Sequence, residues 1–327
     1  MTELLSTQIA QSSATVSGRS ASRFATGLRR TGMALIGVVV LLLVWELYRA
    51  LGPVQGVEVG GQRILPRADP RSMPGVGDVL STLGEAEVKV PGSRTVGVAV
   101  LASAWRTLTM AVGGWVLGAM VGIALAIPMQ RLRWVERGLL PYVVLSQTVP
   151  IIAIAPLISG WGGKLQLTPT LAWQPWMSVV VISAYLAFCP VALGTLRGLQ
   201  APSAAAQELF ASFAATGRQT LLRLRLPASL PFLVPALRLA AAQAVVGAIV
   251  AEISTGTRGG IGRLILQYAQ QATSSPGRLY AAILGAALLG LLAAALVSLL
   301  DVAVLRPGSR TRVTPGDPVD TTTGRTS

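Results

Sequence analysis

The strongest constraint on this chain is the length of its runs without a charged residue. Only 12% of its 327 residues are charged, and 52% are hydrophobic. Four runs contain no Asp, Glu, Lys or Arg; they are Thr107–Gln130, Gly138–Gly163, Leu165–Leu196 and Leu279–Leu300. A helix needs roughly 20 apolar residues to cross the hydrocarbon core of a bilayer. We therefore expect each run to form one membrane-spanning helix, and a soluble or disordered chain is strongly disfavoured.

Two further apolar segments carry charges only near their ends. They are Gly32–Leu51 and Phe232–Ile253, and each holds one Arg and one Glu. Long arginine side chains near a helix end can reach the lipid headgroups, so neither segment is excluded as a span. The first lacks a small-x-small cleavage site, which favours an uncleaved anchor over a signal peptide. The sequence thus predicts an all-α integral membrane protein with six transmembrane helices.

The 27 basic residues indicate the orientation. If the N-terminus is cytoplasmic, 15 of them fall on inside segments and 9 on outside segments. Cytoplasmic loops of membrane proteins carry an excess of Lys and Arg, so this asymmetry predicts that both termini are cytoplasmic. The formal net charge of +14 is then explained by the orientation of the chain in the membrane. We expect no nucleic-acid partner, and membrane lipid as the surroundings.

Several kinds of chemistry are excluded by composition. The chain has no histidine and one cysteine, Cys189, so catalysis by a His base and a Cys/His metal site are both ruled out. The phosphate-binding pattern Gly-x4-Gly-Lys-Ser/Thr is absent; the segment 160–165 fails both its spacing and its last residue. We expect no catalytic residue, no metal and no cofactor bound by this chain.

The segment between the fourth and fifth predicted spans is the most informative. Its residues 204–215 have helical propensity without the bulk to span a membrane. Leu209 and Phe213 share one helical face, with Phe210 beside them. A helix that binds a lipid surface usually carries several Lys or Arg, but 203–217 has none. This favours a protein partner whose groove accepts the helix.

This segment resembles the EAA loop of permease subunits in bacterial binding-protein-dependent ABC importers. That pattern is Glu-Ala-Ala, three residues, Gly, nine residues and Ile-x-Leu-Pro. It aligns here without a gap, with Glu208 at its Glu, Ala214 at its Gly, Leu224 at its Ile, and Leu226-Pro227 at its end. Leu209 and Phe210 replace the two alanines. Alanine disfavours the left-handed backbone that glycine allows, so the flexible point is expected at Gly217 instead.

Flanking segments resemble the nitrate, sulfonate, taurine and bicarbonate branch of these permeases, which also includes pyrimidine-precursor and riboflavin carriers. The resemblance covers roughly residues 64–305. It rests on prolines at 227, 231 and 235, on the run 247–252 that ends in Glu, on the glycine-rich turn 259–262, on Gln-Thr-Val-Pro at 147–150, and on Ile-Leu-Pro at 64–66.

The resemblance implies a type I ABC importer permease fold and a set of partners. These are a cytoplasmic ABC ATPase dimer that binds ATP and Mg, a second permease copy (a homodimer) and an extracytoplasmic substrate-binding protein. It implies that the EAA helix couples to the ATPase. The coupling residues would be Glu208, Leu209, Phe210, Phe213, Ala214, Gly217, Leu224, Leu226 and Pro227. From the sequence alone, Glu208 is equally well interpreted as a solvated helix carboxylate.

Small and polar residues inside the spans give further candidates. Gly114, Gly118 and Gly122 lie four apart on one helical face and favour close helix packing, in a bundle or at a dimer interface. Candidate residues of a translocation path are Gln147, Thr148, Gln243, Glu252 and Ser254. Glu252 has two equally weighted interpretations, an ion pair with Arg258 or Arg263 and a position facing the path.

The predicted organisation has five parts, in the bacterial cytoplasmic membrane. They are a disordered cytoplasmic N-terminus (1–30), a first anchor helix (31–51), a periplasmic loop (52–95) with a short helix at Val76–Leu83, a five-helix permease core (96–305) with a cytoplasmic coupling loop (198–230), and a disordered cytoplasmic tail (306–327).

The competing hypothesis is a stand-alone membrane protein such as a secondary transporter. Six helices and no visible inverted repeat count against it.

Overall fold

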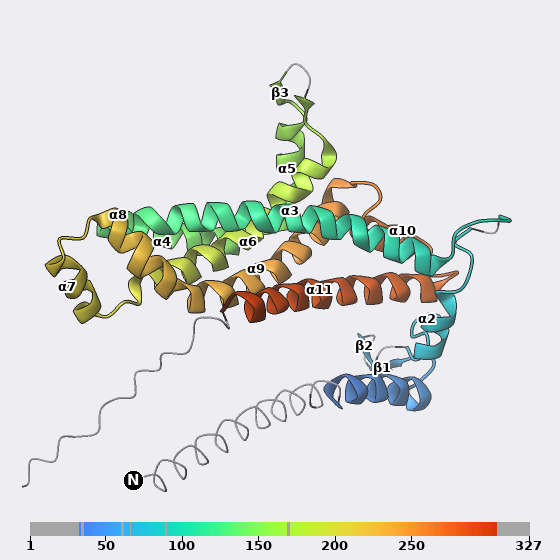
Figure 1. Ribbon diagram of the computed structural model, residues 1–327. Coiled ribbons are helices and arrows are strands. Elements are labelled where there is room, and N and C mark those ends of the chain that lie inside the picture. The colour runs from blue at the N-terminus through green and yellow to red at the C-terminus, as the bar shows by residue number, and fades with distance from the viewer. Residues whose placement is uncertain are drawn as a thin grey trace, which may run out of the picture. The chain divides into compact units, whose positions relative to one another are not determined.

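The computed structural model describes residues 36–59, 62–65, 67–88, 90–168 and 171–305, together with Met33. This part of the chain is predominantly helical and contains two short β-hairpins (Figure 1). The chain divides into two compact units, Met1–Gly84 with Gln271–Tyr280, and Glu85–Gln270 with Ala281–Ser327. The predicted disordered ends, 1–30 and 306–327, lie outside the described residues.

In the smaller unit, hydrogen bonds join the helix that ends at residue 51 to the segment that follows it. Residues 36–51 are helical and precede the antiparallel hairpin of β1 (Val57–Val59) and β2 (Gln62–Leu65), and then α2 (Val76–Thr82). Glu46 Oε1 accepts a hydrogen bond from the Val76 amide at 2.7 Å, and Glu46 Oε2 accepts one from Arg49 Nε at 2.8 Å. The short helix expected near residue 76 is confirmed.

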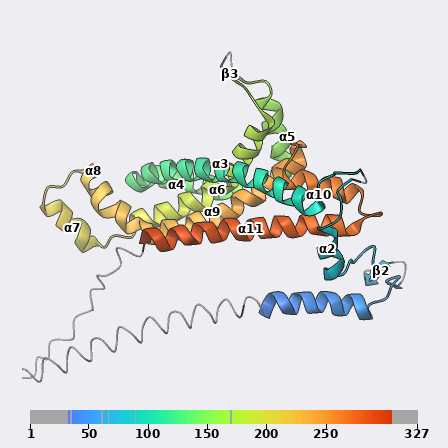
Figure 2. The same ribbon diagram turned by 45° about the vertical axis from the view of Figure 1, so that its right-hand side comes forward.

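Three long helices form the core of the larger unit. They are α3 (Val96–Arg131), α6 (Pro175–Gln200) and α9 (Leu226–Thr255). Helix α6 packs against both of the others, and all three run alongside one another in Figure 2. The prolines at 231 and 235 lie inside α9 without ending it.

Glycine brings α3 and α6 together. Gly114, Gly118 and Gly122 are all buried on the face of α3 that contacts α6. A Cβ atom at Gly118 would lie 2.8 Å from the carbonyl oxygen of Ala184, and one at Gly122 would lie 2.7 Å from that of Phe188. Only residues without a side chain allow the two backbones to approach so closely.

The apolar run at 138–163 differs from the single helix expected there. It forms α4 (Arg133–Leu145), the 3-10 turn η1 (Ser146–Thr148) and α5 (Ile151–Gly162), with a bend of 101° at the break. Pro150 accounts for the break, because it has no N–H and forces the preceding Val149 into an extended conformation (φ −74°, ψ 126°). The prediction of one continuous span is therefore wrong.

The remaining elements border this core. Helix α5 turns away from α3 and α6 and leads into the hairpin of β3 (Gln166–Thr168) and β4 (Leu171–Ala172) (Figure 1). Helix α10 (Ile261–Gln270) packs on α3 and α9. Helix α11 (Pro276–Leu305) belongs to the larger unit from Ala281 onward. There, the side chains of Val100 and Ile261 lie against Gly285.

Within the described residues, four helices are long and apolar enough to cross a membrane. They are Val96–Arg131, Pro175–Gln200, Gly217–Thr255 and Pro276–Leu299, and the bent pair α4–α5 makes a fifth if it counts as one span. The first predicted span, 31–51, lies partly outside the described residues. Its status as a span stays a prediction, as does the cytoplasmic position of both termini.

Candidate functional site

The segment that resembles the EAA loop forms a short helix, α7 (Ala204–Ser212). The hydroxyl of Ser203 caps its start by accepting a hydrogen bond from the Ala206 amide at 3.3 Å. The alanines at 204–206 then favour helix over loop. None of the nine residues of α7 is buried, and the helix projects from the end of the bundle near α8 (Gly217–Thr220) in Figure 1.

One face of α7 is apolar and open to solvent. The side chains of Leu209 and Phe213 are 55% and 77% exposed, and Phe210 is partly buried beside them. Glu208 is exposed and makes no ion pair within residues 171–305. The helix therefore presents two large apolar side chains and one unpaired carboxylate to whatever lies outside the chain.

The turn after α7 corrects the expectation for Ala214. Its φ of 48° is left-handed, although alanine disfavours this conformation, whereas Gly217 simply begins α8. The Ala215 amide bonds to the carbonyl of Phe210 at 3.0 Å, and the Ala214 amide bonds to that of Ala211 at 2.9 Å. This is the Schellman arrangement, which satisfies carbonyls left free at a helix end and requires a left-handed residue at this position.

The chain then returns to the bundle through α8, whose first turn is capped by Thr216. The backbone and hydroxyl of Thr216 exchange hydrogen bonds with Gln219, at 2.8 and 3.4 Å, and begin α8. Next comes the π-helix η2 (Leu221–Arg225), where the Leu226 amide bonds to the carbonyl of Leu221. This wide turn makes room for Pro227, the second residue of α9. Leu224 is partly buried, while Leu226 and Pro227 are exposed.

A contact that the sequence did not suggest joins α7 to η2. Gln207 Oε1 accepts a hydrogen bond from Arg225 Nη2 at 3.0 Å, and Gln207 Nε2 donates to the carbonyl of Pro202 at 2.9 Å. Both side chains are partly buried. The amide of Gln207 thus links the exposed helix to the turn that begins α9. In the sequence, the only signal was a polar residue on the side of α7 opposite its apolar face.

Two predicted path residues lie at the break between α4 and α5. Gln147 and Thr148 form part of η1, and both are exposed. Tyr185 of α6, which the sequence analysis missed, donates a hydrogen bond from its hydroxyl to the carbonyl of Ser146. A break inside a membrane helix frees backbone groups, and neighbouring helices must satisfy them.

Glu252 lies fully buried near the end of α9, where three helices meet. Its Oε1 accepts a hydrogen bond from the hydroxyl of Thr107 on α3 at 2.7 Å, and its Oε2 accepts one from the Gly262 amide on α10 at 2.8 Å. The Thr107 hydroxyl also accepts a hydrogen bond from the Ile261 amide at 2.8 Å. The carboxylate therefore holds the start of α10 against α3 and α9.

Of the two interpretations of Glu252, the ion pair with an arginine is not found in the described part of the chain. Neither Arg258 nor Arg263 forms an ion pair with it within residues 171–305. Of the other path candidates, Gln243 is partly buried on α9, and Ser254 donates to the carbonyl of Val250 at 2.8 Å. The candidates thus fall at two places, the helix break and α9, and no hydrogen bond joins the two places within the described residues. A role of these residues in a path stays a prediction.

Known proteins resemble this chain over most of its larger unit. Residues 118–306 match the family described as binding-protein-dependent transport system inner membrane component. Over 190 residues, the chain is 35% identical to the formylaminopyrimidine transport permease protein ThiX of Halalkalibacterium halodurans, covering 57% of this chain and 69% of that protein. It is 31% identical over 159 residues to the riboflavin transport system permease protein RibX of Chloroflexus aurantiacus, covering 49% and 55% respectively.

Solved structures contain the same fold. The crystal structure of an amino acid ABC transporter with histidines aligns with 64% of this chain and 95% of that chain, at 16% identity and a TM-score of 0.50. The family match covers more than half of the chain, includes α6, α7 and α9, and agrees with the apolar helices described above. The chain therefore belongs to the family of inner membrane components of binding-protein-dependent transport systems, and is a multi-pass permease, a transport subunit of the ABC class.

Proposed function

We propose that this chain is the permease subunit of an ATP-driven importer that accepts a small solute from an extracytoplasmic binding protein and passes it to the cytoplasm. In this proposal two copies form the pathway, two ABC ATPases bind the cytoplasmic face, and ATP and Mg are held by the ATPases alone. The family membership of the chain and the names of its relatives support this assignment.

The observation that carries the proposal is the open apolar face of α7. Leu209 and Phe213 are exposed on a helix that has its own caps and no buried residue. Exposed apolar side chains gathered on one face favour a groove that covers them. The excess of basic residues on the same side of the predicted topology supports a cytoplasmic position for α7, where the ATPase would meet it.

Movement of α7 would reach the membrane through contacts already present. Gln207 holds the helix to Arg225, and η2 continues directly into α9. Closure of the ATPases on α7 would therefore pull on α9, whose far end holds Glu252. The break at Val149–Pro150, with Gln147 and Thr148 beside it, is where we place the polar part of the path. Discontinuous membrane helices commonly carry such sites in transporters.

The test is to replace Phe213 by Asp and to measure both solute uptake and co-purification of the ATPase. Burying a carboxylate in an apolar groove without a partner is strongly unfavourable, so both should fall at least tenfold. The matched control is Ala211→Asp, which places the same charge on the opposite, exposed side of α7. It should leave both measurements within about twofold of the parent.

Normal uptake and normal ATPase binding in Phe213→Asp, with the protein present in the membrane at the parent level, would contradict the proposal. Phe210→Asp and Glu208→Arg extend the same test to neighbouring positions. A stand-alone secondary transporter would instead support uptake in vesicles without any ATPase, driven by an ion gradient. Uptake by the purified chain alone under those conditions would favour that second candidate.

A further inference from the structure

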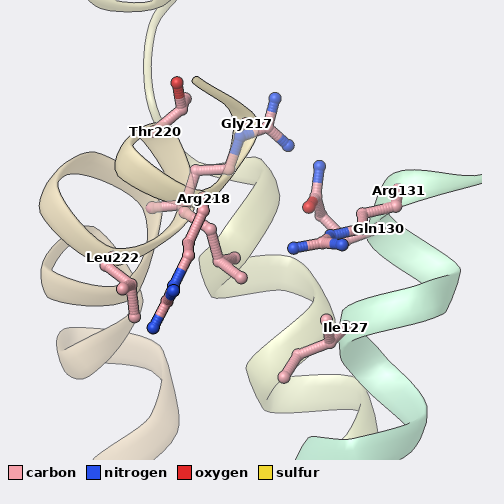
Figure 3. A pocket seen from close by; sticks show the side chains of 9 residues that line it. Ile127, Gln130, Arg131, Gly217, Arg218, Thr220 and Leu222 are labelled. Carbon is pink, nitrogen blue, oxygen red and sulfur yellow. The ribbon is translucent and has the colours of Figure 1, made fainter. Parts of the chain in front are cut away.

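A cavity of about 930 Å³ lies where the end of α3 faces α8 and η2. Arg131 and Gln130 extend from α3 toward the segment that carries Arg218 and Thr220, as Figure 3 shows. Arg225 completes the basic lining. Three guanidinium groups therefore border one cavity, within the range of volumes typical of small-ligand sites.

The positive charge of this cavity is not balanced by the chain. No Asp or Glu lines it, and Arg131, Arg218 and Arg225 form no ion pair within the described residues. Arg225 bonds only to the neutral amide of Gln207, at 3.0 Å. Each guanidinium group presents a planar fork of N–H donors that matches the oxygens of a phosphate group. The unbalanced positive charge of the cavity therefore favours an anion from outside the chain.

The remaining walls of the cavity are apolar. Ile127 lies one helical turn before Arg131, and Leu222 lies on the opposite side (Figure 3). Leu221 also lines the cavity. Arg131 directly follows the charge-free run 107–130 of α3, so we expect the cavity to lie near the level where this helix leaves the hydrocarbon core. A ligand that combines a phosphate group with hydrocarbon would fit both kinds of wall.

We propose that this cavity binds the phosphate group of an anionic phospholipid from the cytoplasmic leaflet. Basic pockets between membrane helices on the cytoplasmic side are suited to such headgroups. The inference relies on the cytoplasmic position of this end of the bundle, which belongs to the proposed function. An acidic segment of the ATPase is the competing occupant. The apolar walls and the level of the cavity at the end of α3 favour the lipid.

The experiment uses the purified full-length chain in a neutral detergent, without ATPase. Native mass spectrometry measures binding of phosphatidylglycerol, with phosphatidylcholine as the uncharged headgroup control and inorganic phosphate as competitor. The test variant is Arg131→Gln with Arg218→Gln. The matched control is Arg133→Gln with Arg137→Gln, which removes two exposed arginines of α4 that do not line the cavity. The double lysine variant at 131 and 218 keeps the charge but loses the planar fork.

We expect the Gln pair at 131 and 218 to weaken binding of phosphatidylglycerol by at least tenfold. The pair at 133 and 137 should change it less than twofold, and the lysine pair should fall between them. Phosphatidylcholine should bind weakly to every variant, and inorganic phosphate should displace the lipid only at far higher concentration. Equal melting temperatures of the two Gln pairs show that both fold alike.

Three results would overturn the proposal. The first is equal loss of lipid binding in the test and control pairs. The second is competition by inorganic phosphate at the same concentration as the lipid, which would identify a site for the free anion. The third is unchanged lipid binding in the test pair while a separate co-purification experiment with the same pair shows loss of the ATPase, which would identify an acidic segment of the ATPase as the occupant. Because the lipid measurement uses no ATPase and no transport, it stands or falls separately from the importer function.

Discussion

The hydroxyl of Thr107 donates a hydrogen bond to the buried carboxylate of Glu252 across 2.7 Å, although 145 positions separate the two residues. The same hydroxyl oxygen accepts the amide of Ile261. One threonine thus satisfies two buried polar groups from two other helices. In an apolar bundle with few polar contacts, this is a point where the loss of one atom affects α3, α9 and α10 together.

Replacing Thr107 by Val keeps the shape of the side chain and removes that oxygen. The Ile261 amide and the Glu252 carboxylate each lose a partner, and we expect a loss of about 1–3 kcal/mol for each buried group left unsatisfied. Denaturant unfolding in mixed micelles measures the change. Thr107→Ser keeps the hydroxyl and should cost less than about 1 kcal/mol. An unfolding free energy of Thr107→Val equal to that of the parent would show that these hydrogen bonds do not stabilise the bundle.

Gly122→Ala should destabilise the packing of α3 against α6. The new Cβ atom would lie 2.7 Å from the carbonyl oxygen of Phe188 and 2.9 Å from the amide nitrogen of Ala192, and neither backbone atom can move freely. We expect a loss of about 1–3 kcal/mol in the free energy of unfolding. Gly138→Ala is the control, because nothing lies within 4 Å of its Cβ position on α4. Gly138→Ala should raise the free energy of unfolding by up to about 1 kcal/mol. The two variants should therefore change the free energy of unfolding in opposite directions.

Ala214→Gly should stabilise the end of α7. The left-handed conformation of a residue with a Cβ atom costs the folded state roughly 1–2 kcal/mol, and glycine removes this cost. Part of the gain in stability is offset because glycine has more conformational freedom in the unfolded chain. Hydrogen exchange should show slower exchange of the Ala215 amide, by up to about fivefold. Ala211→Gly, inside the helix, should have the opposite effect. Faster exchange in Ala214→Gly would argue against a left-handed residue at this position.

Gln207→Ala should separate ATPase binding from transport. The exposed face formed by Leu209 and Phe213 is untouched, so co-purification of the ATPase should persist. The link to Arg225 is lost, so we expect less solute moved per ATP hydrolysed. In a double-mutant cycle, adding Arg225→Ala should cause little further loss, because the shared contact is already absent. Fully additive losses would mean that the two residues act separately.

The helices of the core were predictable because their signal is simple. Every charge in hydrocarbon is costly, so the charge-free runs at 107–130 and 279–300 fall within α3 and α11. The run at 165–196 begins with the hairpin of β3 and β4 and then contains most of α6. The break in the run at 138–163 was missed because counting charges does not show where a helix bends. Pro150 carried that information, since the residue before a proline is pushed out of the helical conformation.

The coupling segment was located by spacing, but its geometry was not. The helical propensity of residues 204–215 predicted a short helix, and α7 confirms it. The left-handed Ala214 contradicts the intrinsic preference of alanine, because the hydrogen bonds that end α7 outweigh a local cost. The pairs Gln207–Arg225 and Thr107–Glu252 join residues whose proximity depends on how whole helices pack, and no local pattern reveals them.

The self-contained structure of the segment between α6 and α8 has a consequence for how such proteins diversify. Ser203 closes one end of α7, the bonded turn at Ala214 closes the other, and Thr216 with Gln219 begins the next helix. None of these bonds draws on the buried core. If α7 binds the ATPase as we propose, substitutions on its outward face would change which ATPase is recognised without changing the bundle, as long as Gln207 and Arg225 keep their contact.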